Sequence, residues 1–127
     1  MFAATNRDRY RFVLAFAVLG AGYSIYLLAR TAVTYASLPL EALTFPAMGA
    51  TALTGSLPSF CHMFAFSLTT AVLLRPWPRA SLVSIGVWAL VEIAFEIAQV
   101  RSAGFTFDPF DLIAIALGGA AAWSCAK

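Results

Sequence analysis

The chain has 127 residues, of which 61% are hydrophobic and only 11% are charged. Soluble domains carry about 25% charged residues, so this chain has too little charge to cover a water-soluble surface. Its formal net charge of +2 is too small and too scattered to indicate binding to nucleic acid, and its length fits one domain, residues 1–127, without a linker.

The first apolar segment, at about residues 12–29, follows a short basic stretch and contains no charge. Its apolar run is longer than the roughly 7–15 residues of a typical signal peptide, so we expect a retained membrane anchor. A helix needs about 20 residues to cross the ~30 Å hydrocarbon core. Because backbone groups in lipid must be satisfied within the segment, a spanning segment should be helical.

The next stretch, residues 31–58, is apolar but is interrupted by prolines and glycines. These interruptions exclude a membrane-spanning helix. The stretch could lie at the outer interface as a short amphipathic helix, or fold back as a cap over the bundle. An ordered apolar loop is an equal alternative.

Three more spans complete an all-α bundle of four transmembrane helices, at about residues 58–74, 80–100 and 107–126. Between the first two of these, the sequence RPWPR places Trp77 between two prolines. This pattern predicts a tight turn at the membrane interface.

The basic residues predict the orientation of the bundle. With the N-terminus inside, Arg7, Arg9, Arg11, Arg75, Arg79 and Lys127 are cytoplasmic, and Arg30 and Arg101 are external. The positive-inside rule therefore favours N-in, C-in. Asp8 and Glu41 are interpreted as ordinary solvated charges. Cys61 and Cys125 should lie near opposite faces of the bilayer, too far apart for a disulfide.

Polar side chains from three predicted helices converge in the outer half of this bundle. Glu92 and Glu96 lie four residues apart and share one helix face, and a chain keeps carboxylates in lipid only where something compensates their cost. Two carboxylates this close should not both ionise. The candidate pocket residues are His62, Glu92, Glu96, Gln99, Arg101, Asp108 and Asp111.

Each candidate also has a structural interpretation. Glu92 and Glu96 could form an internal ion pair with Arg101, and His62 could hydrogen-bond a facing group. Asp108 and Asp111 should lie at the start of the fourth helix, where the helix dipole stabilises negatively charged side chains. No metal-binding, phosphate-binding or nucleophile motif is present, so we expect no metal, no cofactor and no catalytic residue.

Two further stripes concern packing. Ser81, Ser84 and Trp88 continue the face of Glu92 and Glu96 along the third predicted helix, so this face should point into the bundle. In the fourth, Ala114, Gly118 and Ala122 recur every four residues. Small residues at this spacing allow close approach of helices.

At these residues the chain resembles the VanZ-like family of small bacterial membrane proteins. That family has a histidine in an early helix, then Glu-x-x-Gln, an arginine, an aspartate, and Asp-x-x-x-Asn-x-x-Gly. The matching residues here are His62, Glu96, Gln99, Arg101, Asp108, Asp111 and Gly118. The family's asparagine falls on Ile115, and the segment between Arg101 and Asp108 is stretched and aromatic.

The resemblance implies a multi-pass protein of the bacterial cytoplasmic membrane that touches an envelope lipid, glycan or glycopeptide at its outer face. A second hypothesis is a non-catalytic accessory subunit of a larger redox or transport complex, since the chain is small and rich in phenylalanine. A third is an enzyme that acts on a lipid-linked substrate with a glutamate as general base, although no motif supports it. Membrane lipids are the expected partners in every case.

Overall fold

The computed structural model describes residues 5–29, 34–35, 38–39, 52–99 and 109–127. It contains four helices, α1 (Asn6–Ala29), α2 (Ala52–Leu73), α3 (Pro78–Gln99) and α4 (Pro109–Ala126), and two short strands, β1 (Thr34–Tyr35) and β2 (Leu38–Pro39). The strands pair antiparallel, with Thr34 opposite Pro39. The four predicted helices are confirmed. Apart from these strands, most of the stretch between α1 and α2 lies outside the described residues, so its form stays a prediction.

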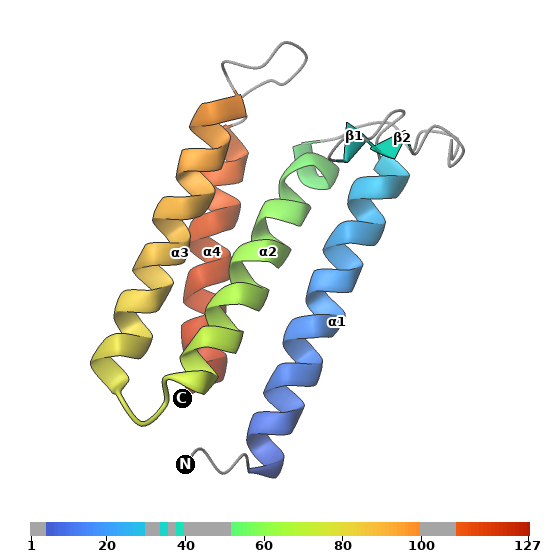
Figure 1. The fold of residues 1–127 in the computed structure, drawn as a ribbon. Coiled ribbons are helices and arrows are strands. Elements are labelled where there is room, and N and C mark those ends of the chain that lie inside the picture. The colour runs from blue at the N-terminus through green and yellow to red at the C-terminus, as the bar shows by residue number, and fades with distance from the viewer. Residues whose placement is uncertain (1–4, 30–33, 36–37, 40–51, 100–108) are drawn as a thin grey trace.

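The helices run up, down, up and down through the bundle (Figure 1). The start of α1, the α2–α3 turn and the end of α4 therefore lie at one end. The central helix is α2, which packs against each of the other three.

Two helix starts differ from the prediction. α1 begins at Asn6 rather than residue 12, because Thr5 caps it: the Thr5 hydroxyl accepts the Asp8 N–H at 3.2 Å and the Asp8 carboxylate accepts the Thr5 N–H at 2.9 Å. This reciprocal pair is a capping box. α2 begins at Ala52 rather than residue 58 and contains Pro58. A proline inside a helix removes one backbone hydrogen bond. α2 nevertheless extends for more than one turn on the N-terminal side of Pro58.

The turn between α2 and α3 matches the expected RPWPR turn. The Trp77 N–H donates to the Leu74 carbonyl at 2.7 Å. α3 then begins at Pro78, where a proline loses nothing because the first helical N–H has no partner in the helix.

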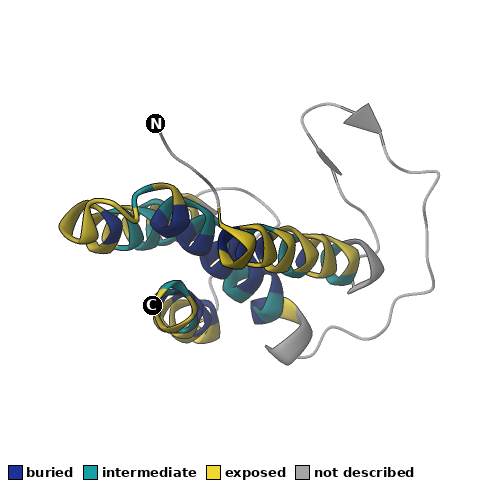
Figure 2. Ribbon diagram, turned by 90° about the horizontal axis from the view of Figure 1, so that it is seen from below, coloured by how far each residue is buried: buried dark blue, intermediate teal, exposed yellow. Residues whose placement is uncertain are grey.

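The packed interior is small and centred on α2. Phe64, Ala65, Leu68 and Val72 of α2 meet Ala15 of α1 and Ala122 of α4. The outer sides of the helices are largely exposed (Figure 2). Along α3 the exposed large apolar side chains are Leu82, Val83, Val87, Leu90, Phe95 and Ile97.

Three helical segments are long and apolar enough to cross a membrane: Gly55–Leu73, Pro78–Ala98 and Pro109–Ala126. A chain that keeps large apolar side chains on the outside of such helices is suited to lipid rather than water. The chain is therefore a helical membrane protein. That the segment at 12–29 also spans the membrane remains a prediction.

The small residues of α4 pack as the sequence predicts. Ala114, Gly118 and Ala122 are all buried, and a Cβ built on Gly118 would lie 2.7 Å from the Phe60 carbonyl oxygen. α4 thus rests directly on the backbone of α2. Cys61 is buried, Cys125 is exposed, and both are free thiols.

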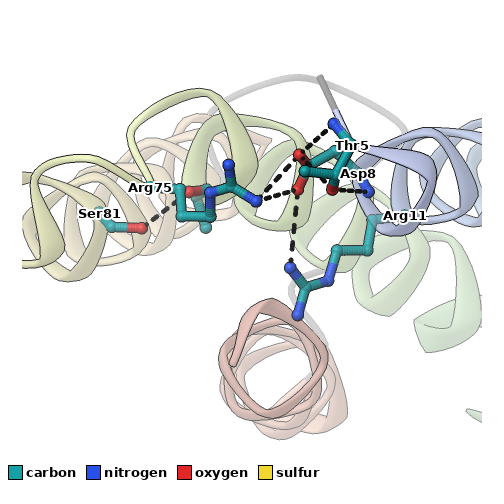
Figure 3. A network of polar contacts seen from close by, with 6 residues as sticks. Thr5, Asp8, Arg11, Arg75 and Ser81 are labelled. Atoms are coloured by element: carbon teal, nitrogen blue, oxygen red, sulfur yellow. Dashed lines mark hydrogen bonds and ion pairs between the residues drawn. The ribbon is translucent and has the colours of Figure 1, made fainter. Parts of the chain in front are cut away.

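The prediction that Asp8 is an ordinary solvated charge is wrong. Its side chain is fully buried, and both its carboxylate oxygens accept the Arg75 Nη1 at 2.9 Å. Arg11 Nη1 lies 3.8 Å from Asp8 Oδ1. Figure 3 shows Asp8 enclosed by Thr5, Arg11 and Arg75. The reason is topological: the fold returns the end of α2 to the start of α1, which sequence position alone does not reveal.

Candidate functional site

The polar stripe of α3 faces α2, as predicted. Nearest the α2–α3 turn, the buried Ser81 hydroxyl donates to the Ala71 carbonyl at 3.0 Å. One turn further along α3, the hydroxyls of Ser84 and Thr70 lie 3.3 Å apart. As the residue number rises along α3, the number of its partner on α2 falls, so the two helices are antiparallel with a defined register.

The same register continues toward the acidic residues. The rings of Trp88 and Phe66 stack with centroids 4.7 Å apart. Two turns beyond Trp88, Glu96 reaches Ser59 of α2. Glu92 lies midway between Trp88 and Glu96 on this stripe and is half-buried. Because Trp88 pairs with Phe66 and Glu96 pairs with Ser59, Glu92 lies at about the level of His62 on α2.

The central feature of the site is a hydroxyl shared by two carboxyl groups. Ser59 Oγ lies 3.5 Å from Glu96 Oε1 and 3.5 Å from Asp111 Oδ1. Both acidic residues are deeply buried, with 6% of Glu96 and 9% of Asp111 exposed. The three residues come from α3, α2 and α4, so the cluster exists only where these helices meet.

The chemistry of this cluster is that of a hydrogen-bond acceptor. A serine hydroxyl has a single proton and can donate to one carboxylate at a time. Ionised carboxylates only accept hydrogen bonds, and close like charges in an apolar setting are costly. Asp111 gains support from its place in the first turn of α4, where the helix dipole favours negative charge. Glu96 and Asp111 also share a side-chain hydrogen bond, which requires a proton on one of the two carboxyl groups. The remaining lone pairs of their oxygens can accept from donors such as hydroxyl or ammonium groups.

His62 has a different environment from the one expected. Its ring lies 5.0 Å from the Tyr23 ring of α1 and 6.1 Å from the Phe66 ring. Its Nε2 is buried and has no hydrogen-bond partner among the residues that the structure describes. Among the described residues, His62 therefore interacts with aromatic rings and forms no hydrogen bond or ion pair with a carboxylate.

The structure thus brings two of the predicted residues, Glu96 and Asp111, to one hydroxyl. Glu92 lies one turn from Glu96 on the same face. Gln99 is the last residue of α3, but its side chain falls outside the described part of the chain, as do Arg101 and Asp108 entirely. Within the described ranges, no group of three His, Cys, Asp or Glu side chains could hold a metal ion.

Ser59 is the site residue that sequence reasoning missed. A serine in an apolar helix gives little signal, because its hydroxyl can bond the backbone of its own helix. Its position three residues before His62 was no guide to the site, because the His62 ring lies against Tyr23 of α1.

Comparison with known proteins adds no further constraint. No protein-family model, no curated protein and no solved structure matches this chain. The resemblance to the VanZ-like family therefore depends on the short motifs described above.

Proposed function

We propose that this chain is a small multi-pass protein of the bacterial cytoplasmic membrane, with four spans and both termini in the cytoplasm. In this proposal, the cluster of Ser59, Glu96 and Asp111 lines an outward-facing pocket that binds a component of the cell envelope. Glu92 extends the pocket along α3. The resemblance to the VanZ-like family supports this assignment through His62, Glu96, Gln99, Arg101, Asp108 and Asp111.

The observation that carries the proposal is the convergence of two buried carboxyl groups on one hydroxyl. An acidic side chain at the centre of a bilayer costs about 2.5–3.5 kcal/mol on insertion scales. The two here lie together toward the end of the bundle, so this figure is an upper bound for each. Ser59, the start of α4 and the hydrogen bond between Glu96 and Asp111 each offset some of this cost. In our proposal the chain retains both groups because a ligand donates hydrogen bonds or positive charge to them.

The chemical class of the ligand follows from the acceptors. Sugar hydroxyls, amide N–H groups and protonated amines donate hydrogen bonds to carboxylates. Glycans, glycopeptides and amine-bearing lipid headgroups of the envelope supply such donors. The proposed orientation would make this location the outer side, because the cluster lies toward the end of the bundle opposite the basic residues (Figure 1).

The test compares Glu96→Gln and Asp111→Asn with wild-type protein in mild detergent. Muropeptides and envelope lipid extracts serve as probes, and the readout is the thermal unfolding midpoint. A ligand at 100 times its dissociation constant stabilises a protein by about 2.7 kcal/mol, so wild type should gain stability with at least one probe. Both variants should lose this gain.

The matched control is Ser124→Ala, an exposed position on α4 that should respond to the probes as wild type does. The stability of the variants measured without any probe distinguishes a ligand-binding cluster from a purely structural one. If the carboxylates serve a ligand, the neutral variants should be at least as stable as wild type, as is common where a site is not optimised for stability. Destabilised variants whose response to the probes is unchanged would show a purely structural network.

A second candidate function is that of an accessory subunit in a larger membrane complex. The large apolar side chains exposed along α3 favour it, because they could cover a partner helix as readily as lipid. Purification of the tagged protein in mild detergent distinguishes the two functions. A stoichiometric partner would favour the accessory role, and a monomer or homodimer would oppose it.

A further inference from the structure

The end of the bundle that carries the start of α1, the α2–α3 turn and the end of α4 is rich in exposed cations. Arg7 and Arg9 lie in the first turn of α1, Arg79 in the first turn of α3, and Lys127 directly after α4, and all four are exposed. Residues from opposite ends of the sequence therefore contribute to one rim. We call these four residues the basic rim.

The acidic residue described at this end does not neutralise the rim. Asp8 is fully buried and is occupied by Arg75 and by its own capping partner Thr5 (Figure 3). Within the described chain, Arg7, Arg9 and Arg79 form no ion pair with a carboxylate. Their charges are thus available to a partner outside the protein.

Aromatic side chains lie among these cations. Tyr10 is 76% exposed and Trp77 is 62% exposed, and the Lys127 Nζ lies 5.3 Å from the centre of the Trp123 ring. Tyrosine and tryptophan favour the headgroup region of a bilayer, where the ring is half in lipid and half in water. Exposed apolar residues continue from this rim along the helices, with Val13 on α1 and Leu82 and Val83 on α3.

From this arrangement we infer that the basic rim binds the phosphate-bearing headgroups of anionic phospholipids in the leaflet it faces. A membrane fits better than nucleic acid, because the cations are interleaved with interfacial aromatics and border apolar helix faces. Each lysine or arginine near an anionic leaflet strengthens binding by roughly fivefold. The inference is separate from the outer carboxylate cluster, because the rim lies at the other end of the bundle.

The experiment measures the lipids retained by intact protein in detergent mixed with phosphatidylglycerol or phosphatidylcholine. Native mass spectrometry counts the bound lipids. Wild type should retain phosphatidylglycerol in preference to phosphatidylcholine. The triple variant R7Q/R9Q/R79Q should need more phosphatidylglycerol to reach the same retention, up to roughly a hundredfold more by the leaflet factor, with no change for phosphatidylcholine.

The matched control is R7K/R9K/R79K, which keeps the charges and should keep the preference. All three positions are exposed, and unchanged thermal unfolding would verify that the variants fold. Equal retention of the two lipids by wild type, or unchanged phosphatidylglycerol retention in the glutamine variant, would overturn the inference. So would an oligonucleotide that displaces phosphatidylglycerol at equimolar concentration.

Discussion

Gly118 shows how one residue controls the packing of two helices. An added Cβ would lie 2.7 Å from the Phe60 carbonyl oxygen and 3.1 Å from the Met63 Cβ. Both neighbours are fixed by the backbone of α2, so neither can move aside without a shift of the helix. Gly119 differs, because its nearest neighbour is the flexible end of Met63.

We therefore expect Gly118→Ala to destabilise the protein by about 1–3 kcal/mol, the usual cost of overpacking. The control is Gly86→Ala on α3, where nothing lies within 4 Å of the added Cβ. That change should be neutral or stabilise by up to ~1 kcal/mol through helix propensity. Chemical unfolding in detergent measures both variants, and equal stability would contradict the close approach of α4 to α2.

At the scale of the elements, Asp8 fastens the start of α1 to the end of α2. It lies before the predicted membrane span, at the rim of the bundle. Hydrogen bonds from the Thr5 backbone and hydroxyl, and the positive charges of Arg75 and Arg11, hold the pKa of Asp8 below its usual value, although burial opposes them. The ionised carboxylate is thus the form that joins the two helices.

The sign of the pH dependence follows from this lowered pKa. In the unfolded chain Asp8 titrates near its ordinary value of about 3.9, and in the folded protein it titrates lower. Its contribution to stability is therefore complete above the unfolded value and is lost as the pH falls through the folded one. At neutral pH, Asp8→Asn should unfold at a lower temperature than wild type.

Thermal unfolding between pH 2 and pH 7 measures this effect, with Arg79→Gln as the control that leaves the Asp8 contacts intact. The difference between wild type and Asp8→Asn should narrow as the pH drops below about 4. A difference that stays constant down to the lowest pH would show that the charge of Asp8 does not join the helices.

The whole molecule is electrically asymmetric along the bundle axis. Among the described residues, the basic side chains lie at the end with the α2–α3 turn, while Glu92, Glu96 and Asp111 lie in the other half. This asymmetry underlies the proposed orientation, because basic residues are retained on the cytoplasmic side of a membrane.

Cys125 offers a direct test of the orientation, since it is exposed in the last turn of α4 while Cys61 is buried. With the C-terminus inside, a membrane-impermeant maleimide should label inside-out vesicles and leave intact spheroplasts unlabelled. Cys125→Ser should abolish labelling, and Cys61→Ser should not change it. Labelling of intact spheroplasts through Cys125 would reverse the proposed topology.

The sequence by itself determined the class of protein, the four helices and the inward polar face of α3. These properties are local: low charge, apolar runs and a period of three to four residues can each be recognised within a short stretch of the sequence. It also identified Glu96 and Asp111 as candidates, because chain direction alone brings their helix ends to one level.

Only the tertiary structure decided which side chains meet. Ser59 approaches Asp111 across 52 positions in sequence, and Arg75 reaches Asp8 across 67. Such contacts depend on how far each helix is rotated about its axis, and that rotation is limited by close packing such as that of Gly118 against Phe60 and Met63. For the same reason the fold, and not the sequence, buried Asp8 and placed the His62 ring against Tyr23 and Phe66.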